Sequence, residues 1–264
     1  MTSPDRLAVR KTYKLYLGGA FPRSESGRSY PVTGASGELL AHAALASRKD
    51  VRDAVAAARS AFAKWSGATA YNRGQVLYRV AEMLEGRRDQ FAAEVRAAEG
   101  GGAPEALAQV DAAIDRLVHY AGWTDKYAQV VGSTNPVAGP YFTFSLPEPT
   151  GVVGMLAPQD SSLLGLVSVV APAIATGNTV VAVASHTRPL PAASFAEVLA
   201  TSDLPGGVVN LLTGDPAELA PWLASHRDVN ALDLTGAAAD QVADLQRAAA
   251  DNVKRVFVPR STDW

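Results

Sequence analysis

The residues best placed to do chemistry form a short polar run at 157–165, which reads APQDSSLLG. It offers an amide from Gln159, a carboxylate from Asp160 and hydroxyls from Ser161 and Ser162. Such groups can bind a ligand or act on developing charge, but no base, thiol or metal-ligand cluster accompanies them. The run lies between an apolar strand-like segment and an apolar helix-like one. In α/β proteins, loops that follow parallel strands in this way bind ligands.

The composition excludes several kinds of chemistry and several kinds of partner. The chain of 264 residues has no cysteine, which excludes disulfides, thiolate metal sites and thiol nucleophiles. Its four histidines, His42, His119, His186 and His226, are far apart and lack metal-ligand spacing, so no metal site is predicted. The net charge of −2 gives no electrostatic case for nucleic acid or for an anionic membrane surface.

The location expected from the sequence is the cytoplasm. The longest apolar run, residues 163–175, is interrupted by Pro172 and is shorter than the ~18 residues of a membrane span. The polar and basic N-terminus has no signal-peptide core.

The elements that must position the polar run alternate regularly from residue 151 onward. Apolar strands are predicted at 151–158, 178–185, 207–214, 230–236 and 254–259, with helices near 162–175, 190–201, 216–226 and 237–252. Strands that are apolar throughout are typical of a parallel sheet covered on both faces. The fold class predicted is therefore α/β, with a doubly wound, Rossmann-like parallel sheet.

The preceding part of the chain predicts a helical layer. Helices are expected over 50–64, with Asp50 as the N-cap, over 71–98, and over about 104–128 after a glycine-rich break. Residues 139–149 alternate, with Phe142 and Phe144 facing one way, which predicts a half-buried strand in a hairpin or at a sheet edge.

The order of these pieces closely resembles the N-terminal, cofactor-binding half of the aldehyde dehydrogenase superfamily, over essentially the whole chain. The resemblance is carried by LGGAF (17–21), GELLA (37–41), DVRDAVAAARSAFAKW (50–65), YAGWTDKY (120–127), PEPTGVVGMLAP (147–158), APAIATGNTVV (171–181), LPGGVVNLLTGD (204–215) and NVKRVF (252–257). It implies one cofactor-binding domain over 1–264. The parts expected are a strand and helical part at 1–138, an oligomerisation hairpin at about 128–149 and a Rossmann-like part at 150–264, with the catalytic domain absent.

The resemblance also implies that the catalytic groups have been lost. Active relatives have Trp-Asn-Phe-Pro at the positions of residues 159–162, and the asparagine helps to hold an oxyanion. Asp160 replaces that donor with an acceptor, and we expect Ser161 or Ser162 to cap the next helix instead. Where relatives have the general-base glutamate, this chain has Pro259 followed by Arg260. No catalytic residue is therefore assigned.

The cofactor-binding positions implied by the resemblance are degenerate. The lysine and glutamate that bind the adenosine ribose are replaced by Val183 and His186, and Ser185 between them is retained. The turn that meets the pyrophosphate keeps Thr235 and Gly236 but has Ala237 for the serine, and Pro216 replaces a glycine after the third strand. Ser185, Thr235 and Gly236 form a weak site at best. No cofactor is expected, and any NAD binding should be weak.

The function predicted is that of a pseudoenzyme, similar to the inactive second unit of family-16 aldehyde dehydrogenases. It would have a structural or regulatory role, and we expect no enzyme activity from the chain alone. The resemblance implies pairing with a full-length aldehyde dehydrogenase, or with a second copy, through the hairpin around Tyr141, Phe142, Phe144 and Leu146. Two alternatives are a residual nucleotide-binding module and an oxidoreductase subunit whose site another chain completes.

Asp233, inside an apolar strand, is either a strand-end contact or a partner contact.

Overall fold

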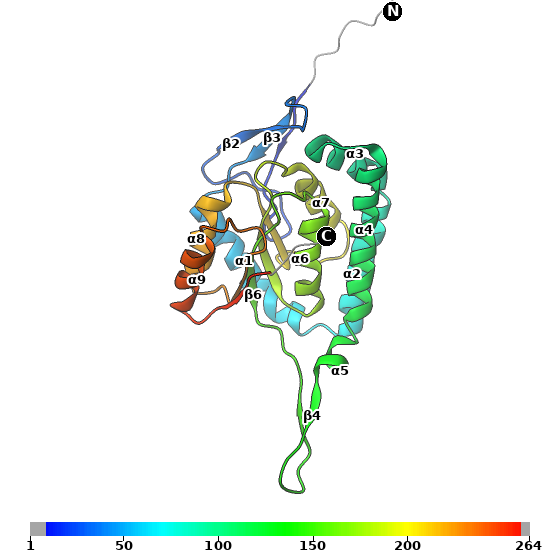
Figure 1. The fold of residues 1–264 in the computed structure, drawn as a ribbon, viewed down its shortest axis with the longest axis vertical. Coiled ribbons are helices and arrows are strands. Elements are labelled where there is room, and N and C mark those ends of the chain that lie inside the picture. The colour runs from blue at the N-terminus through cyan, green and yellow to red at the C-terminus, as the bar shows by residue number, and fades with distance from the viewer. Residues whose placement is uncertain (1–8, 260–264) are drawn as a thin grey trace, which may run out of the picture.

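The computed structural model describes residues 9–259, and within them a parallel five-stranded sheet forms the centre of the molecule (Figure 1). Its strands are β6 (Val152–Leu156), β7 (Thr179–Val183), β8 (Val209–Leu212), β9 (Ala231–Asp233) and β10 (Arg255–Phe257). They lie in the order β10-β9-β6-β7-β8, so the chain winds outward from β6 in one direction and then in the other. The predicted doubly wound α/β fold is confirmed, and each strand lies inside its predicted segment.

Helices cover both faces of the sheet, as the apolar strands require. One face carries α1 (Arg48–Ser66), α8 (Pro216–Ser225) and α9 (Val242–Ala250), and the other carries α6 (Leu164–Ala175) and α7 (Leu190–Ala200). Side chains of β7 alternate between the two hydrophobic cores. Val180 and Ala182 join the core beneath α6 and α7, whereas Val181 and Val183 join the core beneath α1 and α8.

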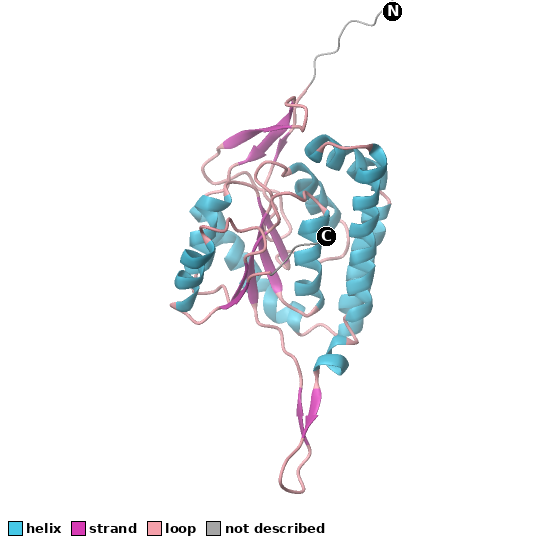
Figure 2. Cartoon of the chain, in the orientation of Figure 1, coloured by secondary structure: helices cyan, strands magenta, loops and turns pink. Residues whose placement is uncertain are grey.

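An outer helical layer packs over α6 and α7 (Figure 2). It consists of α2 (Ala70–Glu85), α3 (Arg88–Glu99) and α4 (Ala103–Trp123). The prediction of a single helix over 71–98 is wrong, because α2 ends at Glu85, with Gly86 as its C-cap, and α3 begins after Arg87. The break allows Leu84 and Phe91, both fully buried, to point into the same core. The helix predicted over 104–128 is also divided, since α5 (Tyr127–Val131) follows α4 after a turn.

The start of α1 differs from the sequence prediction. The N-cap is Ser47, not Asp50, and Ser47 Oγ accepts a hydrogen bond from the Lys49 N–H. Asp50 occupies the third helical position, where its Oδ2 accepts from the Ser47 N–H at 2.7 Å and from Ser24 Oγ at 2.7 Å. The two residues form a reciprocal capping box, which satisfies backbone donors that a lone Asp50 cap would leave unpaired.

The hairpin is formed by β4 (Ser133–Asn135) and β5 (Thr143–Ser145), which pair antiparallel and project from one end of the molecule (Figure 1). The prediction of a half-buried strand over 139–149 is wrong in two respects. The strand is limited to β5, and its flanking side chains are exposed, Phe142 by 79% and Leu146 by 62%. No element within residues 9–259 packs against this hairpin strongly enough to cover its aromatic side chains.

A small N-terminal sheet lies at the opposite end of the molecule from the hairpin (Figure 1). Its strands are β1 (Thr12–Tyr13), β2 (Ser29–Thr33) and β3 (Leu39–Ala44), in the order β1-β3-β2. Through Tyr30 in β2 this sheet reaches the loop that follows β7. None of the helices in the described part of the chain is long and apolar enough to cross a membrane.

Candidate functional site

The carboxyl ends of the central strands open onto a cleft of about 660 Å³. Its walls come from the loops after β6, β7, β8 and β9, which place Asp160, His186, Thr235 and Gly236 along one depression. In a doubly wound sheet this edge is where ligands bind, beside the strand at which the winding reverses. Thus the fold brings two of the three predicted cofactor residues into the cleft, while Ser185 lies beneath it and is 3% exposed.

The loop after β6 is held by its own hydrogen bonds. The Gln159 side chain donates to the Ala157 carbonyl oxygen at 2.7 Å and accepts from the His186 N–H at 2.9 Å. The Gln159 carbonyl oxygen accepts from Ser185 Oγ at 2.9 Å. Gln159 therefore joins the ends of β6 and β7, and the Ser185 hydroxyl is engaged inside the protein.

Ser161 and Ser162 have different roles. The predicted cap is wrong in its position, because the N-cap of α6 is Leu163, but Ser161 Oγ still accepts from the Gly165 N–H in the first turn at 2.9 Å. Ser162 donates both its N–H and its hydroxyl to Glu99 Oε1, each at 2.6 Å. Glu99, at the end of α3, also accepts from Gln109. Glu99 was not predicted from the sequence, because a partner that lies 63 residues away leaves no local signal.

The Thr235–Gly236 turn is also internally satisfied. Thr235 donates its N–H and its hydroxyl to Asp233 Oδ1, the former at 2.9 Å. The Gly236 N–H donates to the Leu156 carbonyl oxygen at 2.8 Å. A Cβ on Gly236 would lie 1.9 Å from the Ala157 carbonyl oxygen, so this position requires glycine for its close approach to the end of β6.

The same contacts make Asp233 a strand-end contact, one of the two roles considered from the sequence. Burial raises the pKa of the Asp233 carboxyl above its ordinary value, and the hydrogen bonds from Thr235 act in the opposite direction. The carboxylate thereby ties the end of β9 to the turn that follows it, and the backbone donor it uses is not free to meet a ligand.

The cleft is acidic. Asp160, Asp215 and Asp240 line it, and among the described residues no arginine or lysine does so. Arg188 is not among the lining residues, and its guanidinium donates to the carbonyl oxygen of Asp160. Asp215 caps α8 by accepting from the Ala217 N–H at 2.9 Å, so a side chain already occupies that helix N-terminus. An anion entering the cleft meets like charge.

The remaining positions are structural. Val183 is fully buried, so it contributes to a hydrophobic core and not to the cleft. The His186 ring stacks on Tyr30 with the ring centroids 4.8 Å apart, and the Tyr30 hydroxyl donates to the His186 carbonyl oxygen. Pro216 begins α8. Pro259 follows β10, while Arg260 lies outside the described residues.

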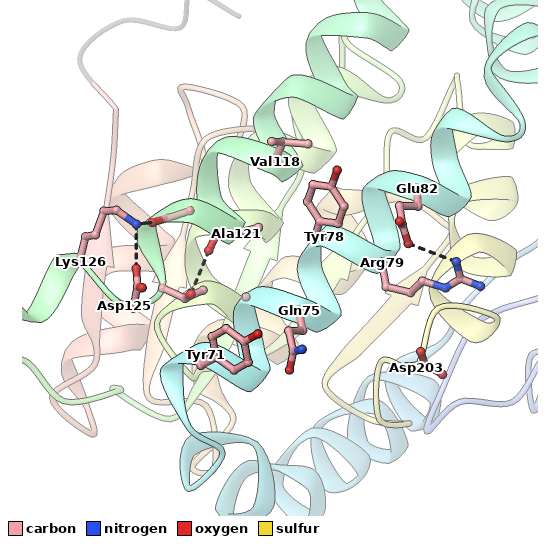
Figure 3. A pocket seen from close by; sticks show the side chains of 13 residues that line it. Tyr71, Gln75, Tyr78, Arg79, Glu82, Val118, Ala121, Asp125, Lys126 and Asp203 are labelled. Carbon is pink, nitrogen blue, oxygen red and sulfur yellow. Dashed lines mark hydrogen bonds and ion pairs between the residues drawn. The ribbon is translucent and has the colours of Figure 1, made fainter.

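A second depression of about 600 Å³ runs along α2 and α4 on the outer layer (Figure 3). Tyr71, Gln75 and Tyr78 project into it from α2. Its cations are already paired, Arg79 with Glu82 at 3.1 Å and Lys126 with Asp125 at 2.9 Å (Figure 3). Among the described residues this groove therefore offers exposed aromatic surface but no free cationic group, and we assign it no chemistry.

Comparison with protein families matches residues 22–259 to the model described as "Aldehyde dehydrogenase family". The chain is 35% identical over 248 residues to the mitochondrial benzaldehyde dehydrogenase of Antirrhinum majus, covering 92% of this chain and 46% of that protein. It is 34% identical over 263 residues to retinal dehydrogenase 2 of Mus musculus, covering 97% and 50%.

Solved structures give the same result for the fold. HpcC from Thermus thermophilus superposes with a TM-score of 0.87 at 32% identity, covering 93% of this chain and 47% of that one. An NAD+ complex of aldehyde dehydrogenase from Bacillus cereus superposes with a TM-score of 0.86 at 27% identity, covering 93% and 50%. This chain thus spans about half the length of these relatives, and the half it matches includes the parallel sheet described above.

Proposed function

The chain belongs to the aldehyde dehydrogenase family, and we propose that it acts there as a catalytically silent subunit with a structural or regulatory role. One observation carries the proposal. At the edge of the sheet where this fold binds ligands, the retained polar groups bond to the protein itself: Ser185 to Gln159, Thr235 to Asp233, and Gly236 to Leu156. The fold is maintained while the groups that would act on a ligand are engaged elsewhere.

The residues of the cleft do not fit tight binding of NAD, the cofactor that the family and its NAD+-bound structural neighbours suggest. Neither Val183, which is buried, nor His186, which stacks on Tyr30, supplies the lost ribose contacts. Each lost charge-assisted hydrogen bond costs roughly 1.5–3 kcal/mol, so two weaken binding by about two to four orders of magnitude. The carboxylates of the cleft add repulsion toward the pyrophosphate.

A calorimetric titration with NAD tests this part of the proposal. We expect a dissociation constant of about 1 mM or weaker, because the missing contacts and the acidic lining act together. Neutralising one cleft carboxylate by Asp240→Asn should strengthen binding, by roughly tenfold or less, and the effect should shrink at high salt. The control is Asp244→Asn, which removes the same negative charge from α9 at a residue that does not line the cleft. A micromolar constant for the unmodified protein would overturn the proposal.

The partner proposed for this subunit is a full-length aldehyde dehydrogenase or a second copy of this chain, bound through the β4–β5 hairpin. The hairpin supports this because Tyr141, Phe142, Phe144 and Leu146 are all more than half exposed. Residues 127–147 include no charged side chain. An uncharged, aromatic, two-stranded ribbon with open edges is prone to pair with another chain, and edge addition is a common way to cover one.

The hairpin variants Thr143→Pro and Phe142→Ser/Phe144→Ser test the proposed contact. The first removes a backbone donor from β5 and the second removes apolar surface. Both are expected to abolish the association seen by light scattering, or co-elution with an aldehyde dehydrogenase identified by mass spectrometry. The far-ultraviolet circular dichroism should stay unchanged, because no core residue is altered. The matched control, Tyr71→Ser, removes an aromatic ring that is 70% exposed on α2 and should leave association intact. A monomer at tens of micromolar, with no dehydrogenase recovered from the host, contradicts the pairing.

A second candidate function, a residual nucleotide-binding module, is favoured by the cleft of about 660 Å³, which is large enough for a nucleotide. The same titration with ADP or NADP separates it from the first candidate.

The third candidate function is an oxidoreductase whose site another chain completes. It requires Asp160 to stand where a hydrogen-bond donor is needed. An NADH assay of the co-purified complex, with and without this chain, tests it.

A further inference from the structure

A separate hollow of about 360 Å³ lies between the start of α1 and the end of α8. Arg48 and Arg52 reach it from α1, Trp222 from α8, and His226 and Arg227 from the turn that follows α8. It shares no lining residue with the cleft at the carboxyl ends of the strands. Nothing in the proposed function uses these residues.

The charges around this hollow are unbalanced. Three guanidinium groups line it, and no carboxylate among the described residues does. Arg52 Nε pairs with Asp53 at 2.8 Å, but within residues 9–259 neither Arg48 nor Arg227 forms an ion pair. Because the whole chain has a net charge of −2, the cationic character is local to this hollow and does not reflect the composition.

One contact holds the Arg48 guanidinium in place before any ligand arrives. The Arg48 guanidinium lies over the Trp222 ring, 4.3 Å from the ring centroid, and Val51 beside it is fully buried. A guanidinium stacked on an aromatic face keeps its N–H groups directed outward in its own plane. Arg48 therefore loses less side-chain freedom on binding than an unrestrained surface arginine would.

His226 adds a neutral donor at the edge of the hollow. Its Nδ1 accepts a hydrogen bond from the Asp228 N–H at 3.2 Å, which places the ring proton on Nε2. Burial, opposed in part by Asp228 and aided by Lys254 and Arg59, lowers the pKa of His226 below its ordinary value. The lowered pKa favours the neutral ring, whose Nε2–H has no hydrogen-bond partner within residues 9–259.

We propose that this hollow binds a small, multiply charged oxyanion of the diphosphate class. Arginine forks match the oxygen geometry of phosphate and bind it in a bidentate manner, and several forks around one depression favour more than one phosphoryl group. A diphosphate can reach the site free in solution or as part of a nucleotide. The assignment is independent of the proposed function, since it uses no residue of the cleft or of the hairpin.

Calorimetric titration of the full chain with inorganic pyrophosphate and, separately, with ADP tests the assignment. We expect saturable binding of pyrophosphate in the submillimolar range at low salt, weakened as salt is added. Arg48→Gln and Arg227→Gln should each weaken it at least tenfold, because each removes a charge-assisted contact. The control, Arg79→Gln, removes an exposed arginine of α2 that lies outside the hollow and should change the affinity less than twofold.

The outcomes are separable. Tighter binding of ADP than of pyrophosphate assigns the site to a nucleotide, and equal or weaker binding assigns it to a free diphosphate. The proposal is overturned by the absence of binding at 10 mM pyrophosphate, or by equal losses in Arg79→Gln and Arg48→Gln. It is also overturned if Asp240→Asn in the cleft strengthens pyrophosphate binding while Arg48→Gln leaves it unchanged, because the anion then belongs to the cleft. Thermal unfolding of each variant without ligand verifies that the fold is retained.

Discussion

Purified protein mixed with NAD and short-chain or aromatic aldehydes is expected to form no NADH above the rate without protein, and to hydrolyse no ester. Both reactions of this family need an activated nucleophile and a general base. The chain has no cysteine, and the resemblance to the family implies that Pro259 replaces the base and that Asp160 replaces the oxyanion donor with an acceptor. Loss of a nucleophile by itself removes several orders of magnitude in rate.

The informative variant for this experiment is Asp160→Asn. It restores the donor that relatives use and leaves the nucleophile absent, so activity should remain at background. A full-length aldehyde dehydrogenase measured in the same buffer is the positive control. Aldehyde-dependent NADH formation by pure protein that disappears in Asp160→Ala would show that the cleft is catalytic and that the proposal is wrong.

Gly236→Ala is expected to destabilise the protein by about 3 kcal/mol, or roughly 6–12 °C in melting temperature. The new Cβ would lie 1.9 Å from the Ala157 carbonyl oxygen and 2.9 Å from that of Leu156, both backbone atoms at the end of β6. The clash cannot be relieved by a side-chain rotation. It must separate the turn after β9 from β6 and break the hydrogen bond from the Gly236 N–H to Leu156.

Gly122→Ala is the matched control, because a Cβ there meets nothing within 4 Å. In α4 that change should be neutral or stabilising by up to about 1 kcal/mol, since alanine is the better helix former. Thermal unfolding followed by circular dichroism compares the two variants. If Gly236→Ala has the same melting temperature as the unmodified protein, packing does not require the glycine. The better explanation is then that a ligand must approach the backbone at this position.

The sequence alone determined the types of the elements in the central sheet and the order in which they follow one another along the chain. Each predicted strand contains its observed strand because runs such as 178–185 are apolar on both faces, and such runs are stable only beneath two helical layers. Leu84 and Phe91 lie on apolar helical stripes, which are local patterns of the same kind. The resemblance to the aldehyde dehydrogenases depended on many such segments in one order, and the family match over 22–259 confirms it.

Local signals were less reliable where two candidates compete within a few residues. Ser47 and Asp50 are both good helix caps, and the choice was made by Ser24, which binds Asp50 from 26 residues away. The break at Gly86 was missed because the apolar spacing continues through it. At the hairpin, alternation predicted burial, yet a strand is buried only if another layer lies against it, and the described chain provides none that covers Phe142.

The state of the candidate site was decided by the tertiary structure. Ser185, Thr235 and Gly236 could be named from the sequence as retained positions, but not that their polar groups are engaged. Their partners are Gln159, Asp233 and Leu156, of which only Asp233 is a near neighbour in sequence. The hydrogen bonds from Ser162 to Glu99 join residues 63 positions apart, and the contact of the Arg48 guanidinium with the Trp222 ring joins two helices. Periodicity encodes which face of an element is apolar, whereas the partner of a single polar atom is fixed only when distant segments are packed together.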